Sequence, residues 1–374
     1  MARLMSLSKL TLAIALGVGV VATGIGGAVR AQTAPRVAEP VAHANLAVYF
    51  LHGTSAAGPV PLTLSEAMAK GVVTVHETGN VNQLEIENGG TEDVFVQAGD
   101  IVKGGQQDRV LMVSLLLSAR SGRLPIGAFC VEQGRWSARG KEDVKRFASS
   151  DKAVPSREAK LAMLAPAKPR PELEPLPGNL APTGALNQTA RLRPQALGGG
   201  SDTGIRQGEV WANVGRIQEK LSGNLKAKVA AGASASSLQL SLENDALATA
   251  KAAYVNALRD KAGDGDIVGV AIAINGRISS AEVYPSHGLF AKMWPKLLDA
   301  GATEAIGDAH EAASTVPATT VVAAFLAAAD GGKANPAAPI AAGLSRQAFE
   351  GADALAVATR SADGAEIHRT YLAR

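Results

Sequence analysis

A proline-rich stretch at residues 137–204 interrupts the chain and most limits how it can fold. Eight prolines lie between positions 155 and 194, and three successive glycines follow at 198–200. Such a segment cannot bury enough apolar surface to offset the entropy that is lost when it becomes ordered. We therefore predict a disordered Pro/Gly-rich insertion over 137–204, serving as a linker or as an arm that binds a partner.

The part before the insertion, residues 45–136, has the pattern of a strand-rich lobe. Short segments rich in β-branched or aromatic residues are separated by Gly, Asn and Asp, which favour turns. In 83–88, apolar residues alternate with glutamates, as expected for a strand with one face in water. A short helix at 62–70, capped by Thr63 or Ser65, interrupts the series. The predicted strands are 46–51, 72–77, 83–88, 93–97, 109–117 and 127–132.

Helical periodicity returns after the insertion, and residues 205–312 are predicted to form a lobe of helices and a hairpin. Residues 266–275 are a nearly continuous apolar run, typical of a strand buried on both faces. The Asn275-Gly276 dipeptide that follows favours a tight hairpin turn. Residues 313–374 are predicted to add a C-terminal extension of one helix and a second hairpin. The predicted helices cover 210–221, 243–261, 289–298 and 319–329, and the predicted strands cover 266–275, 279–284, 354–359 and 366–372.

These patterns predict a mixed α/β (α+β) fold. The strand-rich first lobe and the helix-plus-hairpin second lobe would form one domain unit, which the Pro/Gly-rich insertion interrupts.

The first 31 residues have the three regions of a secretory signal peptide. Arg3 and Lys9 provide a positive start, an apolar run follows over 10–21, and small residues precede a cleavage point near Ala31. The apolar run is shorter than the roughly 20 residues of a membrane-spanning helix. We expect cleavage and a secreted or periplasmic protein without a membrane span; retention of the segment as an anchor is the alternative.

Removal of residues 1–31 also changes the charge of the chain. The whole sequence has 37 basic and 34 acidic residues, and the leader holds three basic residues and no acidic one. The mature chain, with a flexible lead-in at 32–44, is thus electrically balanced, so no nucleic-acid partner is expected. Its single cysteine, Cys130, excludes an internal disulfide. Many alanines and few aromatic residues are typical of a bacterial protein.

The densest polar pattern lies in two blocks, AGDIVKGGQQDRVL at 98–111 and FCVEQGRW at 129–136. Adjacent glycines let backbone N–H groups approach a ligand, or permit a tight turn. Asp108 can pair with Arg109, and Glu132 with Arg135. The catalytic candidates are Asp108, Glu132 and Cys130, and the ligand-binding candidates in these blocks are Asp100, Lys103, Gly104, Gly105, Gln106, Gln107, Arg109, Arg135 and Trp136.

The sequence leaves several interpretations of these blocks open. The charged residues can form a buried lattice that fixes strand register, with Cys130 as a small buried apolar side chain. They can instead form a site in which Asp108 or Glu132 is a general acid or base and Cys130 a nucleophile. A third hypothesis is phosphate binding by the glycine loop.

Several motifs of known chemistry are absent from the sequence. It contains no GxSxG elbow, no HExxH, no CxxC pair and no P-loop, because Gly104-Gly105 is followed by Gln instead of Lys. The six histidines are scattered, and no two of them are four residues apart. We therefore predict neither a metal nor a cofactor.

The two polar blocks, together with Gln207-Gly208-Glu209-Val210-Trp211 and VGVAIAINGRISSAEVY at 268–284, resemble the ARG and Rhodanese-Phosphatase-superfamily-associated Protein domain. The resemblance covers about 45–136 and 205–312, and implies one domain with a variable insertion. It adds Gln207 and Trp211 to the ligand-binding candidates. The function of that family is unknown, so the resemblance implies no catalytic residue.

Without a recognisable catalytic constellation, we expect an exported, soluble, non-catalytic binding or scaffolding module of the bacterial cell envelope. Its partner would be a small molecule or another envelope protein. The alternative is an uncharacterised hydrolase or transferase that uses the polar cluster at 98–136.

Overall fold

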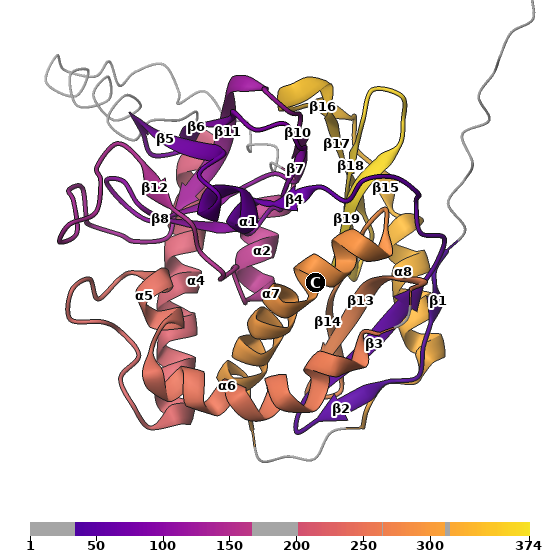
Figure 1. Ribbon diagram of the computed structural model, residues 1–374. Coiled ribbons are helices and arrows are strands. Elements are labelled where there is room, and N and C mark those ends of the chain that lie inside the picture. Colours follow the sequence, from indigo (N-terminus) through magenta and orange to yellow (C-terminus); the bar gives the residue numbers. More distant parts are fainter. Residues whose placement is uncertain (1–33, 167–200, 264, 311–314) are drawn as a thin grey trace, which may run out of the picture. The chain divides into compact units, whose positions relative to one another are not determined.

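The computed structural model describes residues 34–166, 201–263, 265–310 and 315–374 (Figure 1). The predicted signal peptide at 1–31 lies outside these residues, as do positions 167–200 of the predicted insertion. Within the described ranges, no helix combines the length and the apolar character that crossing a membrane requires.

A ten-stranded sheet takes its strands from both ends of the sequence. Its order is β1-β3-β13-β14-β19-β18-β17-β15, with β2 beside β3 and β16 beside β17, and the pairs are antiparallel. The strands are β1 (Arg36–Val37), β2 (Val41–His43), β3 (Leu46–His52), β13 (Ile267–Ile274), β14 (Arg277–Val283), β15 (Lys333–Ala334), β16 (Ala338–Pro339), β17 (Ser345–Glu350), β18 (Ala354–Arg360) and β19 (Glu366–Ala373).

The sheet crosses two of the boundaries that were predicted between the lobes and the C-terminal extension. Strand β3, which was expected in the first lobe, pairs with β13 of the second lobe, from Ile274 opposite Leu46 to Ile267 opposite His52. Strand β19 pairs with β14, so the C-terminal hairpin is an integral part of the sheet instead of an extension. The reason is burial: β3 is a continuous buried run, and such a strand needs partners on both edges.

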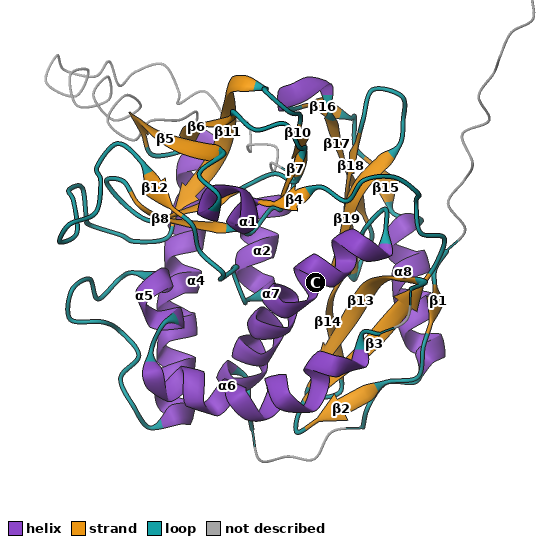
Figure 2. Cartoon of the chain, viewed as in Figure 1, coloured by secondary structure: helices purple, strands orange, loops and turns teal. Residues whose placement is uncertain are grey.

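Strand β13 is buried on both faces, as its apolar run predicts. Helices α6 (Asp245–Leu258), which continues into the 3₁₀ turn η1 (Arg259–Lys261), and α7 (His287–Gly307) cover one face of the sheet (Figure 2). Helix α8 (Thr319–Asp330) covers the other face. Val270 and Ile272 of β13 belong to the core on the α7 side, whereas Ala271 and Ala273 belong to the core on the α8 side.

Two smaller sheets carry the polar blocks. A six-stranded sheet has the order β12-β8-β9-β11-β6-β5, and a three-stranded sheet has the order β10-β7-β4. Helix α1 (Leu64–Ala69) starts at the predicted cap Thr63, whose side chain accepts from the backbone of Glu66. The strands are β4 (Leu62–Thr63), β5 (Val73–Asn80), β6 (Gln83–Asn88), β7 (Val94–Val96), β8 (Ile101–Gly104), β9 (Arg109–Leu111), β10 (Leu115–Leu117), β11 (Gly122–Cys130) and β12 (Phe147–Ala148).

The segment predicted as a disordered insertion contains regular structure at both ends. Strand β12 and helix α2 (Arg157–Leu164) lie in it, and helix α4 (Ser201–Leu225) begins before its predicted end. Helix α2 is possible because its flanking prolines, Pro155 and Pro166, lie outside it and Ser156 caps its start. The apolar face of α2 packs with that of α4 in one core. Two further short elements are α5 (Leu238–Leu242) and the 3₁₀ turn η2 (Ala341–Gly343).

Candidate functional site

Strands β9 and β11 bring the two candidate acids together at one end of the six-stranded sheet. Asp108 directly precedes β9 and Glu132 lies just beyond β11, and Arg109 pairs in register with Cys130. The backbone N–H of Asp108 donates to Oε2 of Glu132 at 3.0 Å. Both side chains are completely buried. The two sequence blocks therefore do form one cluster.

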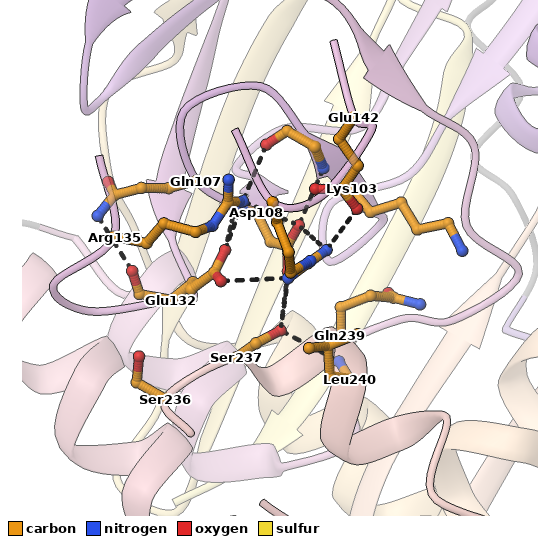
Figure 3. Close-up of polar contacts among 12 residues, drawn as sticks. Lys103, Gln107, Asp108, Glu132, Arg135, Glu142, Ser236, Ser237, Gln239 and Leu240 are labelled. Atoms are coloured by element: carbon orange, nitrogen blue, oxygen red, sulfur yellow. Dashed lines mark hydrogen bonds and ion pairs between the residues drawn. The ribbon is translucent and has the colours of Figure 1, made fainter. Parts of the chain in front are cut away.

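Two arginines neutralise this pair of carboxylates (Figure 3). Arg135 lies 2.6 Å from Oε2 of Glu132, as the sequence predicts. Arg139, which sequence reasoning did not single out, reaches Asp108 at 2.9 Å and Glu132 at 3.1 Å through the same nitrogen. Its second nitrogen donates to Glu142 at 2.8 Å. Arg139 was missed because it lies in the segment interpreted as disordered.

A residue from a distant helix completes the cluster. Ser237 is the N-cap of α5, where its hydroxyl accepts from the N–H of Leu240 and donates to Oδ2 of Asp108 at 2.8 Å. The N–H of Leu238 also donates to the carbonyl of Val131 at 3.0 Å. The start of α5 is thus fastened to the end of β11. No local sequence signal distinguishes Ser237 from its neighbouring serines.

The environment shifts the pKa values of the two acids in opposite directions. Burial raises the pKa of Asp108, and the charge of Glu132 adds to this rise, while hydrogen bonds from Arg139 and Gly104 only partly oppose it. Burial also acts to raise the pKa of Glu132, but the bonds from Arg135 and from the backbone of Asp108 outweigh it and lower that pKa. The pair therefore has an acid that holds its proton more strongly than usual beside one that ionises readily.

Arg109 does not form the predicted pair with Asp108. Its side chain is completely buried, donates to the carbonyl of Gln107 at 2.8 Å and lies 3.6 Å from Glu77. Burial lowers the pKa of this guanidinium. Trp136, which is 47% exposed, lies over it with the ring centroid 5.7 Å from the central carbon. Asp108 pairs with Arg139 instead, because the Arg109 side chain is bound to the carbonyl of Gln107 and lies near Glu77.

The glycine loop is occupied by the protein itself. Gly104 and Gly105 have positive φ angles of 106° and 54°, and their N–H groups donate to the Asp108 carboxylate and to the carbonyl of Asp143 at 2.9 and 3.1 Å. The two glycines therefore permit a tight turn, and these donors are not free for a phosphate. Around them, Gln107 donates to the carbonyl of Glu132, and the N–H of Gln106 lies 3.3 Å from Glu77.

Two predicted binding residues lie outside the cluster. Asp100 is buried in a separate network, in which it pairs with Lys296 at 2.8 Å and accepts from the N–H of Gln97. Lys103 is partly exposed and forms a 2.9 Å ion pair with Glu243 near the surface. Both residues are close to Asp108 in sequence, but Asp100 lies just before β8 and Lys103 near its other end, so the two side chains reach different partners.

Cys130 is held between β11 and α4. The side-chain amide of Gln207 accepts from the N–H of Cys130 at 2.9 Å and donates to its carbonyl at 2.8 Å, as a neighbouring strand would. Burial raises the pKa of the Cys130 thiol, and the smaller opposing effects of Arg109 and of the Trp211 side chain do not reverse the shift. Gln207 and Trp211 thus belong to the interface between sheet and helix.

A cavity of about 200 Å³ lies elsewhere, where α2, α4 and α7 meet. Ser156 and Glu158 line it from the start of α2, Arg216 and Ile217 from α4, and Glu304 from the end of α7. None of the catalytic or ligand-binding candidates from the sequence lines this cavity. The described residues contain no group of three or more His, Cys, Asp or Glu side chains placed to hold a metal ion.

The fold and the cluster define a mixed α+β domain whose distant segments are joined by an arginine–carboxylate network. The family model of the ARG and Rhodanese-Phosphatase-superfamily-associated Protein domain matches residues 34–372, and the chain belongs to this family. The match includes the C-terminal strands, beyond the 45–136 and 205–312 expected from the sequence. No match was found among curated proteins or among solved structures.

Proposed function

We propose that this protein is an exported, non-catalytic binding module of the bacterial cell envelope, and that its ligand site is the cavity between α2, α4 and α7. The observation that carries the proposal is the contrast between two places. The polar cluster is buried and neutralised by its own arginines, whereas the cavity is open and lined by mixed polar and apolar side chains. The partner would be a small molecule, or another envelope protein that presents one.

The cluster supports this proposal as a structural device. Asp108, Glu132, Arg135 and Arg139 come from two loops, and Ser237 ties them to α5. A substrate could reach the carboxylates only by displacing an arginine, which would leave buried charge unpaired. Such networks fix register and orientation, so we assign the 104–142 region the role of locking the sheet end to the helices.

One observation favours the alternative, a hydrolase or transferase. The pKa of Asp108 is raised while that of the adjacent Glu132 is lowered, and paired acids with separated pKa values are the usual arrangement for general acid–base catalysis. Cys130 would be an unsuitable nucleophile in such an enzyme because burial raises the pKa of its thiol.

Substitution of Asp108 separates the two functions. In a structural cluster, Asp108→Asn should lower the free energy of unfolding by about 3 kcal/mol, because it leaves buried arginine charge without its partner. Glu142→Gln is the matched control: it removes a partly exposed partner of the same Arg139 and should cost about 0–1 kcal/mol. The measurement is denaturant unfolding of both variants beside the full chain.

Turnover tests the alternative directly. The full chain and Asp108→Asn are incubated with chromogenic esters, phosphate esters and glycosides. We expect no turnover by either protein. Turnover by the full chain that Asp108→Asn abolishes, with little loss of stability, would overturn the proposal.

Export is tested by expressing the chain in a bacterial host and sequencing the N-terminus of the periplasmic protein, which should begin near residue 32.

A further inference from the structure

Glu304 differs from the other sheltered acids of the described chain. Each described acid that is at most 3% exposed has a lysine or arginine nitrogen within 3.3 Å: Asp100 with Lys296, Asp108 with Arg139, Glu132 with Arg135, and Glu282 with Lys160. Glu77, whose side chain is 4% exposed, also has a cation nearby, with Arg109 at 3.6 Å. Oε1 of Glu304 accepts from the backbone of Arg157 and from the hydroxyl of Ser279, both at 3.1 Å. Oε2 receives no donor within the described residues.

The charged groups around Glu304 do not supply a dedicated counter-ion. The charge of Lys160 of α2 acts on Glu304, but the Lys160 nitrogen is bound to Glu282 at 3.3 Å. Glu158 of α2 adds a repulsive charge, although its own carboxylate is bound by Arg157 at 2.7 Å. Among the groups that line the cavity from α4 and the end of α7, Lys220 pairs with Asp308 at 2.6 Å.

Arg216 carries the complementary charge. It lines the same cavity from α4, and its guanidinium donates to the neutral side chain of Asn213 at 2.8 Å. Within the described residues it has no ion pair with a carboxylate. Ile217 and Leu221, one and five positions further along α4, add apolar side chains to the lining of the cavity. The cavity thus combines an acid without a counter-ion, an arginine without a carboxylate, and an aliphatic surface.

We propose that this cavity binds a small zwitterion, in which a short aliphatic chain joins an ammonium group to a carboxylate. The inference rests on the proposed binding function and names its ligand class. The ammonium would donate to Oε2 of Glu304, the carboxylate would accept from Arg216, and the chain would lie on Ile217 and Leu221. A volume of about 200 Å³ is below the roughly 300–1,000 Å³ of pockets for drug-sized ligands, so the ligand is small.

The binding of such a ligand depends on pH through Glu304. Burial raises the pKa of Glu304 to about 7, and the bond from the backbone of Arg157 and the charge of Lys160 limit the rise. An ammonium group binds the ionised carboxylate, so affinity should increase as pH rises through 7. Affinity at pH 6 should be about tenfold lower than at pH 8, because the ionised fraction changes by that factor.

Calorimetric titration of the full chain tests the inference. The probes are ω-amino acids from 3-aminopropanoate to 6-aminohexanoate, with pentylamine and pentanoate as single-charge controls. We expect at least one amino acid to bind, pentylamine to bind about tenfold more weakly for lack of the arginine contact, and pentanoate to bind least. Binding at pH 6 should release a proton, which two buffers of different ionisation enthalpy will report.

Three variants assign the contacts. Glu304→Gln should abolish the pH dependence and weaken binding by about tenfold or more. Arg216→Gln should reduce the amino acid to the affinity of pentylamine. Glu158→Gln is the comparison, because it removes a cavity-lining carboxylate but keeps Glu304 and Arg216. It should leave the affinity at pH 8 nearly unchanged and move the pH dependence to lower pH, because the charge of Glu158 helps to raise the pKa of Glu304.

The inference is overturned if none of the amino acids binds, or if binding survives in Glu304→Gln with the same pH dependence. A thermal-shift screen with sugars, nucleotides and dicarboxylates distinguishes this failure from failure of the binding function. Gly307→Leu fills the cavity from the end of α7, where a side chain at position 307 would meet Leu221. If a compound stabilises the full chain and this variant no longer binds it, the binding function stands. If the screen finds no such compound, both proposals are overturned.

Discussion

At the scale of single residues, the sheltered carboxylates differ in the groups that bind them. Asp108 and Glu132 are held by arginines from the same chain, and their charges are balanced inside the fold. Glu304 is held by a backbone N–H and a serine hydroxyl, which leaves its charge uncompensated. Burial of an unpaired acid costs free energy, and proteins retain such groups chiefly where function needs them.

Glu304→Gln should stabilise the protein at alkaline pH. The pKa of Glu304 in the folded chain, about 7, is above its ordinary value of 4.5. Its contribution to stability is therefore complete below pH 4.5 and is lost as pH rises through 7. Without ligand, the variant should be more stable than the parent at pH 8 by up to about 3 kcal/mol, and about equal near pH 4.

Denaturant unfolding at the two pH values provides the measurement, with Glu158→Gln as the comparison. The pKa of Glu158 is lowered, since its bond to Arg157 outweighs burial, so that variant should lose stability at pH 8 instead of gaining it. Equal effects of the two substitutions at pH 8 would contradict the assignment of Glu304 as an uncompensated acid.

The sequence predicts which residue types meet in the cluster, but only part of their pairing. Asp108, Glu132 and Arg135 come together because β9 and β11 are neighbours, which their spacing and pattern indicate. Arg139 was excluded by the interpretation of 137–204 as disordered, and Ser237 could not be selected because its contact with Asp108 spans 129 positions of sequence. Glu304 and Arg216 carry no local motif at all, and only helix packing brings them to one cavity.

At the scale of elements, the turn between β8 and β9 depends on the packing of β12. Gly105 has a φ of 54°, and a Cβ atom there would lie 2.5 Å from the ring of Phe147 in β12. The backbone at Gly105 and the ring of Phe147 are thus packed so closely that no side-chain atom fits between them. This contact explains the glycine at 105, while the glycine at 104 is explained by its φ of 106°.

Gly105→Ala should destabilise the fold more than Gly140→Ala. Gly140 has a similar φ of 62°, but a Cβ atom there meets nothing within 4 Å. Both substitutions should cost about 1 kcal/mol for the left-handed backbone, and Gly105→Ala a further roughly 1–3 kcal/mol for overpacking against Phe147. Thermal unfolding of the two variants measures the difference; equal midpoints would show that Phe147 moves aside freely.

Element types were more predictable than element partners. The apolar run of β13, the turn at Asn275 and the cap of α1 were predicted from the sequence and are present in the structure. The 109–117 segment was predicted as one strand but is divided into β9 and β10, which belong to different sheets. The partners of β3 and β19 were not predictable, because strand pattern indicates burial and not which strand lies alongside.

At the scale of the whole molecule, the segments before and after positions 167–200 share their main contacts. Strand β3 pairs with β13, Gln207 of α4 binds Cys130 of β11, and α2 packs on α4. The continuity of the chain through 167–200 is therefore not what holds the two parts together.

A chain cut within 167–200 should remain one particle. A recognition site for a sequence-specific protease is placed between positions 180 and 190, and the protein is cleaved after folding. Both fragments should elute together in native buffer and separate only in denaturant, because the β3–β13 pairing and the cores remain buried. Separation in native buffer would show that the connection itself supplies the association.

The position of β3 also determines when the protein can fold. Residues 46–52 leave the ribosome more than two hundred positions before their partner strand at 267–274, and β14 precedes its partner β19 by more than eighty positions. Contacts of such sequence separation form slowly, and an N-terminal half on its own offers β3 only the short strands β1 and β2 as partners. The ten-stranded sheet can therefore be completed only when synthesis is nearly finished, whereas the strands of the six-stranded sheet all lie within 73–148 and can pair earlier.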